Sequence, residues 1–123
     1  MRRTLAMTLL ALSVSACASF YQPSATAWVK CEDKAHCDTL WDRAQTWIAT
    51  NGAYRLQTIT QSVIQTYGPH DNVYGRVAYT ITKEGRPDGN TYIVIRGSCA
   101  PTLYGCVFDP SEDTNRLHSA LTR

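Results

Sequence analysis

The sequence DKAHCDTLWDRAQTWIATNG, residues 33–52, carries the clearest structural signal of this chain. Its apolar side chains recur every three or four residues, which is the spacing of one face of an α-helix. These side chains are Cys37, Leu40, Trp41, Ala44, Trp47 and Ile48. Asp33 is a favourable N-cap, and Asn51-Gly52 predicts a left-handed stop. We therefore predict one amphipathic helix whose two tryptophans belong to the core.

The chain that follows this helix has the composition of β-strands. Residues 53–67 are rich in Thr, Ile, Val and Tyr, but their apolar side chains change face part-way, so we expect a bulge or bend near residues 60–62. Residues 73–82 alternate cleanly between apolar and polar positions, and residues 91–97 form the next strand. These segments predict an antiparallel meander.

A second, shorter helix is predicted to begin at Asp109-Pro110, a cap residue followed by proline at the first helical position. Leu117, Ala120 and Leu121 give it a narrow apolar seam. The expected order is α-β-β-β-α. It predicts an α+β fold in which the N-terminal helix packs on a three- to four-stranded antiparallel meander, with a short C-terminal helix.

The N-terminal segment predicts where the protein is sent. Arg2 and Arg3 precede an apolar run from Leu5 to Val14, and small residues lead to Cys17. This order is that of a secretory signal peptide, and the run is too short to span a membrane, which takes roughly 20 apolar residues. The Val-Ser-Ala-Cys sequence at 14–17 resembles the lipobox of bacterial lipoproteins. The resemblance covers residues 1–17 only, and residues 18–123 resemble no named family.

The lipoprotein resemblance implies that Cys17 is lipidated and becomes the first residue of the mature protein. In such families an aspartate after the cysteine retains the protein at the inner membrane, and Ala18 stands there instead. The resemblance thus implies an outer-membrane protein that faces the periplasm. We expect a signal peptide over 1–16, the lipidated cysteine and a tether over 17–28, and one domain over 29–123.

Four cysteines remain once Cys17 is assigned to lipid: Cys31, Cys37, Cys99 and Cys106. An even number in an oxidising compartment predicts two disulfides. We favour the two local pairings, Cys31–Cys37 and Cys99–Cys106, over the two long-range connectivities that the sequence also permits. A zinc site is not expected, because neither pair has the tight spacing of zinc ligands.

Composition and motifs argue against several classes of function. Of 12 basic and 10 acidic residues, Arg2 and Arg3 leave with the signal peptide, so the mature part has ten of each. This balance and the absence of a basic run argue against nucleic acid as a partner. No catalytic, cofactor-binding or metal-binding motif is present. If the protein were an enzyme, its catalytic residues would be His70 and Asp71, which are neighbours in a predicted turn.

The leading hypothesis is a non-enzymatic lipoprotein, held to the membrane through Cys17, that binds an envelope protein or the cell wall. Tyrosine is favoured at interfaces, and the candidate binding residues are Tyr104, Leu103, Tyr67 and Tyr74. One alternative is an inhibitor whose Cys99–Cys106 loop blocks a periplasmic hydrolase. Another is a protein that binds a small apolar ligand between Trp41, Trp47 and the sheet.

Overall fold

The structure is a computed structural model that describes residues 23–68, 75–99 and 106–123. Within these residues the chain forms strands and helices in the order β-α-β-β-β-β-α. Their bounds are β1 (Ser24–Lys30), α1 (Lys34–Asn51), β2 (Leu56–Ile59), β3 (Val63–Thr66), β4 (Ala78–Gly85), β5 (Thr91–Ser98) and α2 (Pro110–Leu121). None of the described helices is long and apolar enough to cross a membrane.

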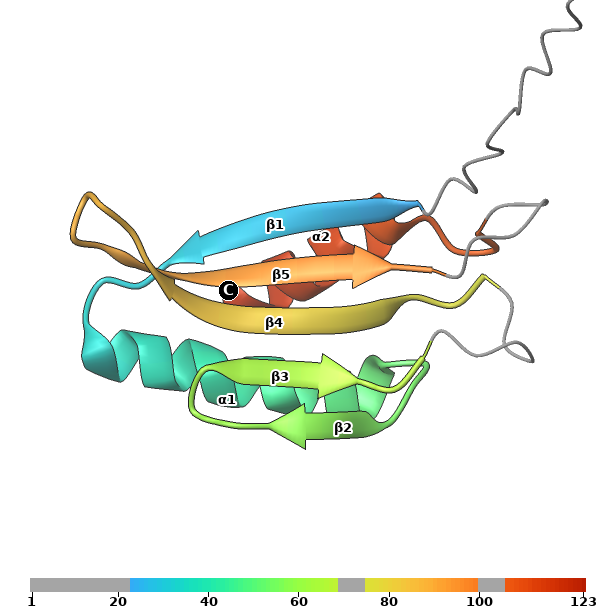
Figure 1. Cartoon of the computed structure of the whole chain (residues 1–123), viewed down its shortest axis with the longest axis horizontal. Coiled ribbons are helices and arrows are strands. Elements are labelled where there is room, and N and C mark those ends of the chain that lie inside the picture. Colours follow the sequence, from blue (N-terminus) through green and yellow to red (C-terminus); the bar gives the residue numbers. More distant parts are fainter. Residues whose placement is uncertain (1–22, 69–74, 100–105) are drawn as a thin grey trace, which may run out of the picture.

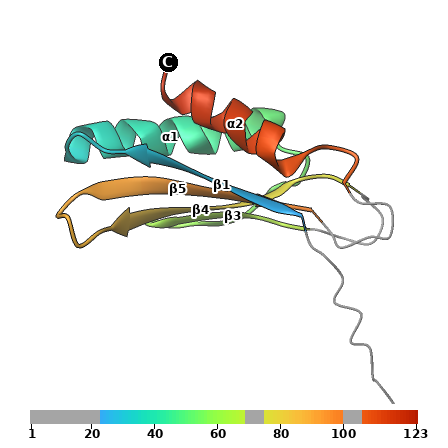
Figure 2. The same ribbon diagram turned by 90° about the horizontal axis from the view of Figure 1, so that it is seen from above.

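The strands form one antiparallel sheet in the order β1-β5-β4-β3-β2 (Figure 1). Both helices lie on the same face of this sheet, and no described element covers the other face (Figure 2). The fold is therefore a two-layer α+β sandwich, as the sequence predicts.

The hydrophobic core lies between the helices and the sheet. Ile64, Ile81 and Ile95 are aligned across β3, β4 and β5 and are fully buried. From α1, Leu40 and Ile48 pack against them. Because side chains of a strand alternate between faces, one row of isoleucines is enough to define the inner face of the sheet.

Helix α1 spans the residues predicted for it, but the conformation at its C-terminal end differs from the prediction. Asp33 caps its start, since its carboxylate accepts the His36 N–H at 2.7 Å. At the other end Gly52 has φ −66°, so the predicted left-handed stop is wrong. The glycine is needed for another reason: an added Cβ would lie 2.5 Å from the Ile48 carbonyl oxygen, which accepts the Gly52 N–H at 2.8 Å.

Helix α2 begins at Pro110 with Asp109 as its N-cap, as predicted. Two side chains from other elements hold it in place. Tyr79 of β4 donates its hydroxyl to Asp113 at 2.7 Å, and Arg43 of α1 donates to the carbonyls of Leu121 and Arg123 at 3.2 and 3.0 Å. The last carbonyls of a helix lack partners within it, so Arg43 also completes the end of α2.

Strand β1 was not predicted, and the expected tether over residues 17–28 is wrong from Ser24 onward. Residues 24–27 read Ser-Ala-Thr-Ala, whose small side chains give no recognisable apolar alternation. In the structure β1 pairs with β5 along all seven of its residues and packs beneath α2. The sheet thus has five strands rather than three or four. Tertiary contacts override weak local preference here.

Residues 53–67 form a hairpin rather than one bent strand. The irregularity expected near 60–62 is the turn between β2 and β3, where the Thr60 N–H donates to the Val63 carbonyl at 2.8 Å. The Thr60 hydroxyl accepts in return from the Val63 N–H at 2.9 Å. A register shift also lies within β2, between Leu56 and Thr58. The position of the break was therefore predicted correctly, but not the reversal of the chain.

Candidate functional site

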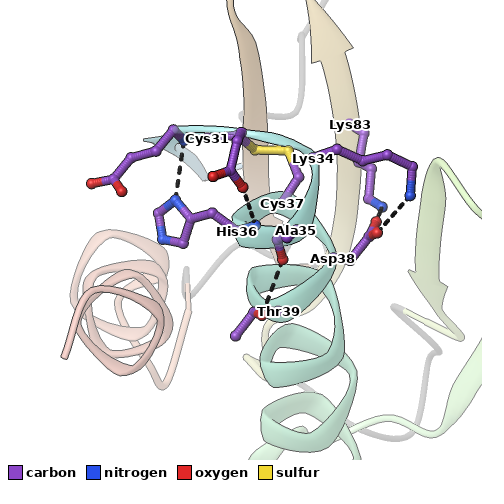
Figure 3. Close-up of a disulfide and its surroundings, with 10 residues drawn as sticks. Cys31, Lys34, Ala35, His36, Cys37, Asp38, Thr39 and Lys83 are labelled. Atoms are coloured by element: carbon purple, nitrogen blue, oxygen red, sulfur yellow. Dashed lines mark hydrogen bonds and ion pairs between the residues drawn. A yellow bond between two sulfur atoms is a disulfide. The ribbon is translucent and has the colours of Figure 1, made fainter.

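Both predicted local disulfides are present in the structure. Cys31 and Cys37 have Cα atoms 5.0 Å apart and join the end of β1 to the first turn of α1 (Figure 3). Cys99 and Cys106, with Cα atoms 6.1 Å apart, join the end of β5 to the segment before α2. The two bridges therefore fix opposite ends of the sheet.

A cavity of about 840 Å³ lies beside the Cys31–Cys37 disulfide. Three segments enclose it: the first turns of α1, the β2–β3 turn and the β4–β5 hairpin. Its lining residues include Asp38, Trp41, Asp42, Thr60, Lys83 and Asn90. The volume is that of a small-molecule site, but such sites are mainly apolar, whereas this wall is charged and polar.

Asp38 organises the charges in this cavity. Its carboxylate accepts from Lys34 of the same helix at 2.7 Å and from Lys83 of β4 at 3.1 Å (Figure 3). These hydrogen bonds, that of Lys34 first, lower the pKa of Asp38, and the bond to Asp38 raises the pKa of Lys34. Both groups lie near solvent, so the contacts fix geometry more than they stabilise the fold.

Lys83 is the more enclosed of the two lysines, with 19% of its side chain exposed. Its ammonium lies 4.9 Å from the centre of the Trp41 ring, within range of a cation–π contact. Trp41 is itself buried, and its indole N–H donates to the Thr60 carbonyl at 3.2 Å. Helix, sheet and hairpin therefore meet at Trp41, which gives the cavity a wall of fixed shape.

The two tryptophans of α1 line separate hollows. Trp41 forms part of the wall of the cavity just described, while Trp47 lines a shallower hollow between α1 and α2. Trp47 packs edge-on against Tyr79, with ring centres 5.9 Å apart. Both side chains pack against the core, as predicted. In the described part of the chain they do not enclose one shared space, so the apolar-ligand alternative gains no support.

The uncovered face of the sheet carries a second ordered cluster. The Arg86 guanidinium stacks 3.5 Å from the centre of the Trp28 ring, and Tyr92 meets Trp28 edge-on at 6.4 Å. Tyr92 also donates its hydroxyl to Asp88 at 3.1 Å. Trp28 remains 44% exposed. The arrangement leaves a large aromatic side chain on the outermost strand.

Beside this cluster, Glu84 gathers three polar groups. It accepts from Thr82 at 2.6 Å and from Arg96 at 2.8 Å, and Arg86 lies 4.0 Å away. The hydrogen bond from Thr82, followed by that from Arg96, lowers the pKa of Glu84. The open face is thus an array of paired charges and hydroxyls.

Most site residues named from the sequence fall outside the described residues: the lipidation site Cys17, the binding candidates Tyr74, Leu103 and Tyr104, and the pair His70 and Asp71. Tyr67 directly follows β3, is 43% exposed, and donates its N–H to the Arg55 carbonyl at 2.9 Å. The structure does not bring Tyr67 to the cavity. No group of metal-ligating side chains occurs in the part of the chain that the structure describes.

Sequence reasoning missed the residues that the structure brings together, above all Asp38, Lys83, Trp28 and Arg86. Asp38 and Lys83 are 45 residues apart in the chain, so no spacing rule connects them. Comparison of the chain with family models, curated proteins and solved structures found no match.

Proposed function

We propose that this chain is a non-enzymatic lipoprotein, attached through Cys17 to the outer membrane and facing the periplasm, whose domain binds an envelope partner. The attachment rests on the Val-Ser-Ala-Cys sequence at 14–17. The Cys31–Cys37 and Cys99–Cys106 disulfides support an extracytoplasmic compartment, since such bridges persist where the environment is oxidising.

The start of β1 limits how far the domain extends from the membrane. Only Ala18 to Pro23 separate Cys17 from Ser24, a distance of at most about 25 Å when fully extended. The cavity lies at the other end of β1, beside Cys31. Seven strand residues measure about 23 Å, so the cavity lies about one strand length from Ser24, where the folded domain begins.

The observation that carries this proposal is the charged cavity with its ordered Asp38–Lys83–Trp41 wall. Groups that are held in place before binding lose little conformational entropy when a partner docks. Carboxylates and lysines line the same cavity, so the partner is a polar one that carries charged and hydrogen-bonding groups, such as a peptide segment of an envelope protein or of the cell wall.

Photo-crosslinking in living cells tests this proposal. A photoreactive amino acid replaces Gln61 or Asn90, both at the cavity, and Asn115 on the exposed side of α2 serves as the control position. We expect light-dependent adducts from the cavity positions and none from Asn115. Adducts that a muramidase releases identify the cell wall as the partner, whereas adducts that resist it identify a protein. Adducts at Asn115 alone, or at no position, would contradict the proposal.

A second candidate function, inhibition of a periplasmic hydrolase, is favoured by one observation. Val107 and Phe108 are exposed apolar side chains directly after Cys106, Val107 with 73% of its surface accessible. Phe108 is held by Arg76, whose guanidinium lies 4.8 Å from the ring centre. If this pair forms an inhibitory surface, Val107→Ser with Phe108→Ser abolishes inhibition of muramidases in a cell-wall lysis assay. A wild-type chain without inhibitory activity removes this candidate.

A further inference from the structure

The outer edge of β1 presents regularly spaced backbone groups. The Cys31 N–H donates to the Thr91 carbonyl, and the Cys99 N–H donates to the Pro23 carbonyl. Successive residues of an antiparallel strand point their N–H and C=O groups to opposite sides. The odd-numbered residues of β1 therefore bond to β5. The residues that face away from the sheet are Ser24, Thr26, Trp28 and Lys30, and no described residue bonds to their backbone groups.

The two edges of the sheet differ in how they are protected. At one edge, β2 is only four residues long and has a register shift, both of which discourage pairing with another strand. At the other edge, β1 is seven residues long, keeps one register throughout and contains no proline. Its one charged residue, Lys30, stands at its end. An edge as regular as β1 is a template for a further strand.

Trp28 gives this edge a side chain that suits a second copy. It lies on the uncovered face, one residue from Ala27 at the middle of β1, and is 44% exposed. When two β1 strands pair antiparallel about Ala27, the two Trp28 side chains become diagonal neighbours, a distance that aromatic rings can bridge. Each ring is already stacked on its own Arg86, so the pair extends an existing cluster.

We propose that β1 pairs with β1 of a second copy of this chain, antiparallel about a two-fold axis at Ala27, which joins two five-stranded sheets. Thr26 then lies opposite Trp28 of the partner subunit, and Ser24 opposite the partner's Lys30. No like charges face each other across the axis. All four outward-facing residues of each strand find partners, which gives about eight backbone hydrogen bonds.

This arrangement is compatible with two lipid anchors. Antiparallel pairing places the two Ser24 residues at opposite ends of the paired strands, six residue steps or about 20 Å apart. Strands that run parallel to the bilayer surface hold both Ser24 residues at the same height, and each segment from Cys17 to Ser24 spans up to about 25 Å, so both anchors insert into one bilayer. The inference goes beyond the proposed function, and it fails or holds whether or not the cavity has a partner.

Sedimentation of the full chain in density-matched detergent tests the proposal. We expect the mass of two chains for the wild type and of one chain for Thr26→Pro. Proline at an outward-facing position of an edge strand removes a donor that the single copy does not use, so its own sheet is retained. Ile59→Pro, on the opposite edge at β2, is the matched control and stays dimeric. A wild type with the mass of one chain, or a dimeric and folded Thr26→Pro, overturns the proposal.

A register-specific disulfide decides the case even if Thr26→Pro does not fold. Chains with Thr26→Cys and differently sized chains with Trp28→Cys are produced together, and the mixed disulfide is measured on non-reducing gels. The proposed register places these two positions directly opposite each other and predicts the mixed species. The pair Ser24→Cys and Thr26→Cys is out of register and gives none. Absence of the first mixed species, or equal amounts of both, overturns the proposal.

Discussion

Glu84 shows at the scale of one residue how the open face is organised. Its carboxylate accepts hydrogen bonds from Thr82 and Arg96, and these bonds lower its pKa. A carboxylate whose pKa is lower in the folded state contributes stability above its unfolded pKa of about 4.3. That contribution is lost as the pH falls through the folded value.

We therefore predict that Glu84→Gln lowers the thermal midpoint at pH 7 and that the difference from wild type shrinks toward pH 3. Thermal unfolding of both proteins, monitored by circular dichroism at pH 7 and at pH 3, measures this difference in midpoint. Glu32→Gln, which replaces an exposed carboxylate, is the control and leaves the midpoint nearly unchanged. A deficit in Glu84→Gln that is the same at pH 3 as at pH 7 would count against this role for Glu84.

Tyr79 illustrates a polar group within the core. Its ring is buried, its hydroxyl donates to Asp113, and burial followed by this bond raises its pKa far above the ordinary value. We predict that Tyr79→Phe costs about 1.5–3 kcal/mol of unfolding free energy, the usual net contribution of a hydrogen bond to a charged group. Tyr92→Phe, which removes a surface bond to Asp88, costs less. Urea unfolding of both variants tests the order, and a larger loss in Tyr92→Phe contradicts it.

Residue-level prediction from the sequence succeeded where the cause is local. The cap at Asp33 and the pairing of Cys31 with Cys37 depend on neighbours within a few positions. The ion pair between Asp38 and Lys83 was not predictable, because it forms only when β4 and α1 are brought together by the fold.

At the scale of the element, β5 depends on a glycine where α2 crosses it. A Cβ on Gly97 would lie 2.5 Å from the buried Thr114 hydroxyl and 3.0 Å from Val77. Gly97→Ala should therefore destabilise the protein by about 1–3 kcal/mol through overpacking. Gly85, in β4, has nothing within 4 Å of its Cβ position, so Gly85→Ala is the matched control. Chemical unfolding compares the two, and equal stabilities would contradict the packing of α2 on β5.

The elements that were predicted correctly are those with a strong period of their own. Helix α1 has an apolar stripe, and β5 has buried isoleucines. Strand β1 has neither, and it forms because β5 and α2 supply its partners. Likewise the turn after Thr60 contains no glycine or proline, so the sequence marked a break without revealing a reversal.

At the scale of the whole molecule, the two disulfides close short loops, with sequence separations of 6 and 7. In the chain-entropy model each contributes about 2 kcal/mol. We predict that replacing either pair by alanine lowers the unfolding free energy by that amount and leaves a folded protein, as measured by urea titration. Loss of all structure in the Cys31→Ala, Cys37→Ala variant would show that this bridge does more than close a loop.

The fold class and the disulfide pairing followed from the sequence because they depend on patterning and chemistry along the chain. The cavity did not, since it is made where α1, the β2–β3 turn and the β4–β5 hairpin converge, and only their spatial arrangement brings Trp41, Lys83 and Asn90 together.

Intact mass spectrometry of the protein extracted from membranes tests the attachment at Cys17 most directly. We predict a mature chain that begins at Cys17 and carries the added mass of a diacylglycerol and an acyl chain. We also predict that Cys17→Ala lacks this mass and leaves the membrane fraction. A native protein without lipid mass, or a Cys17→Ala variant that stays in the membrane, would contradict the account.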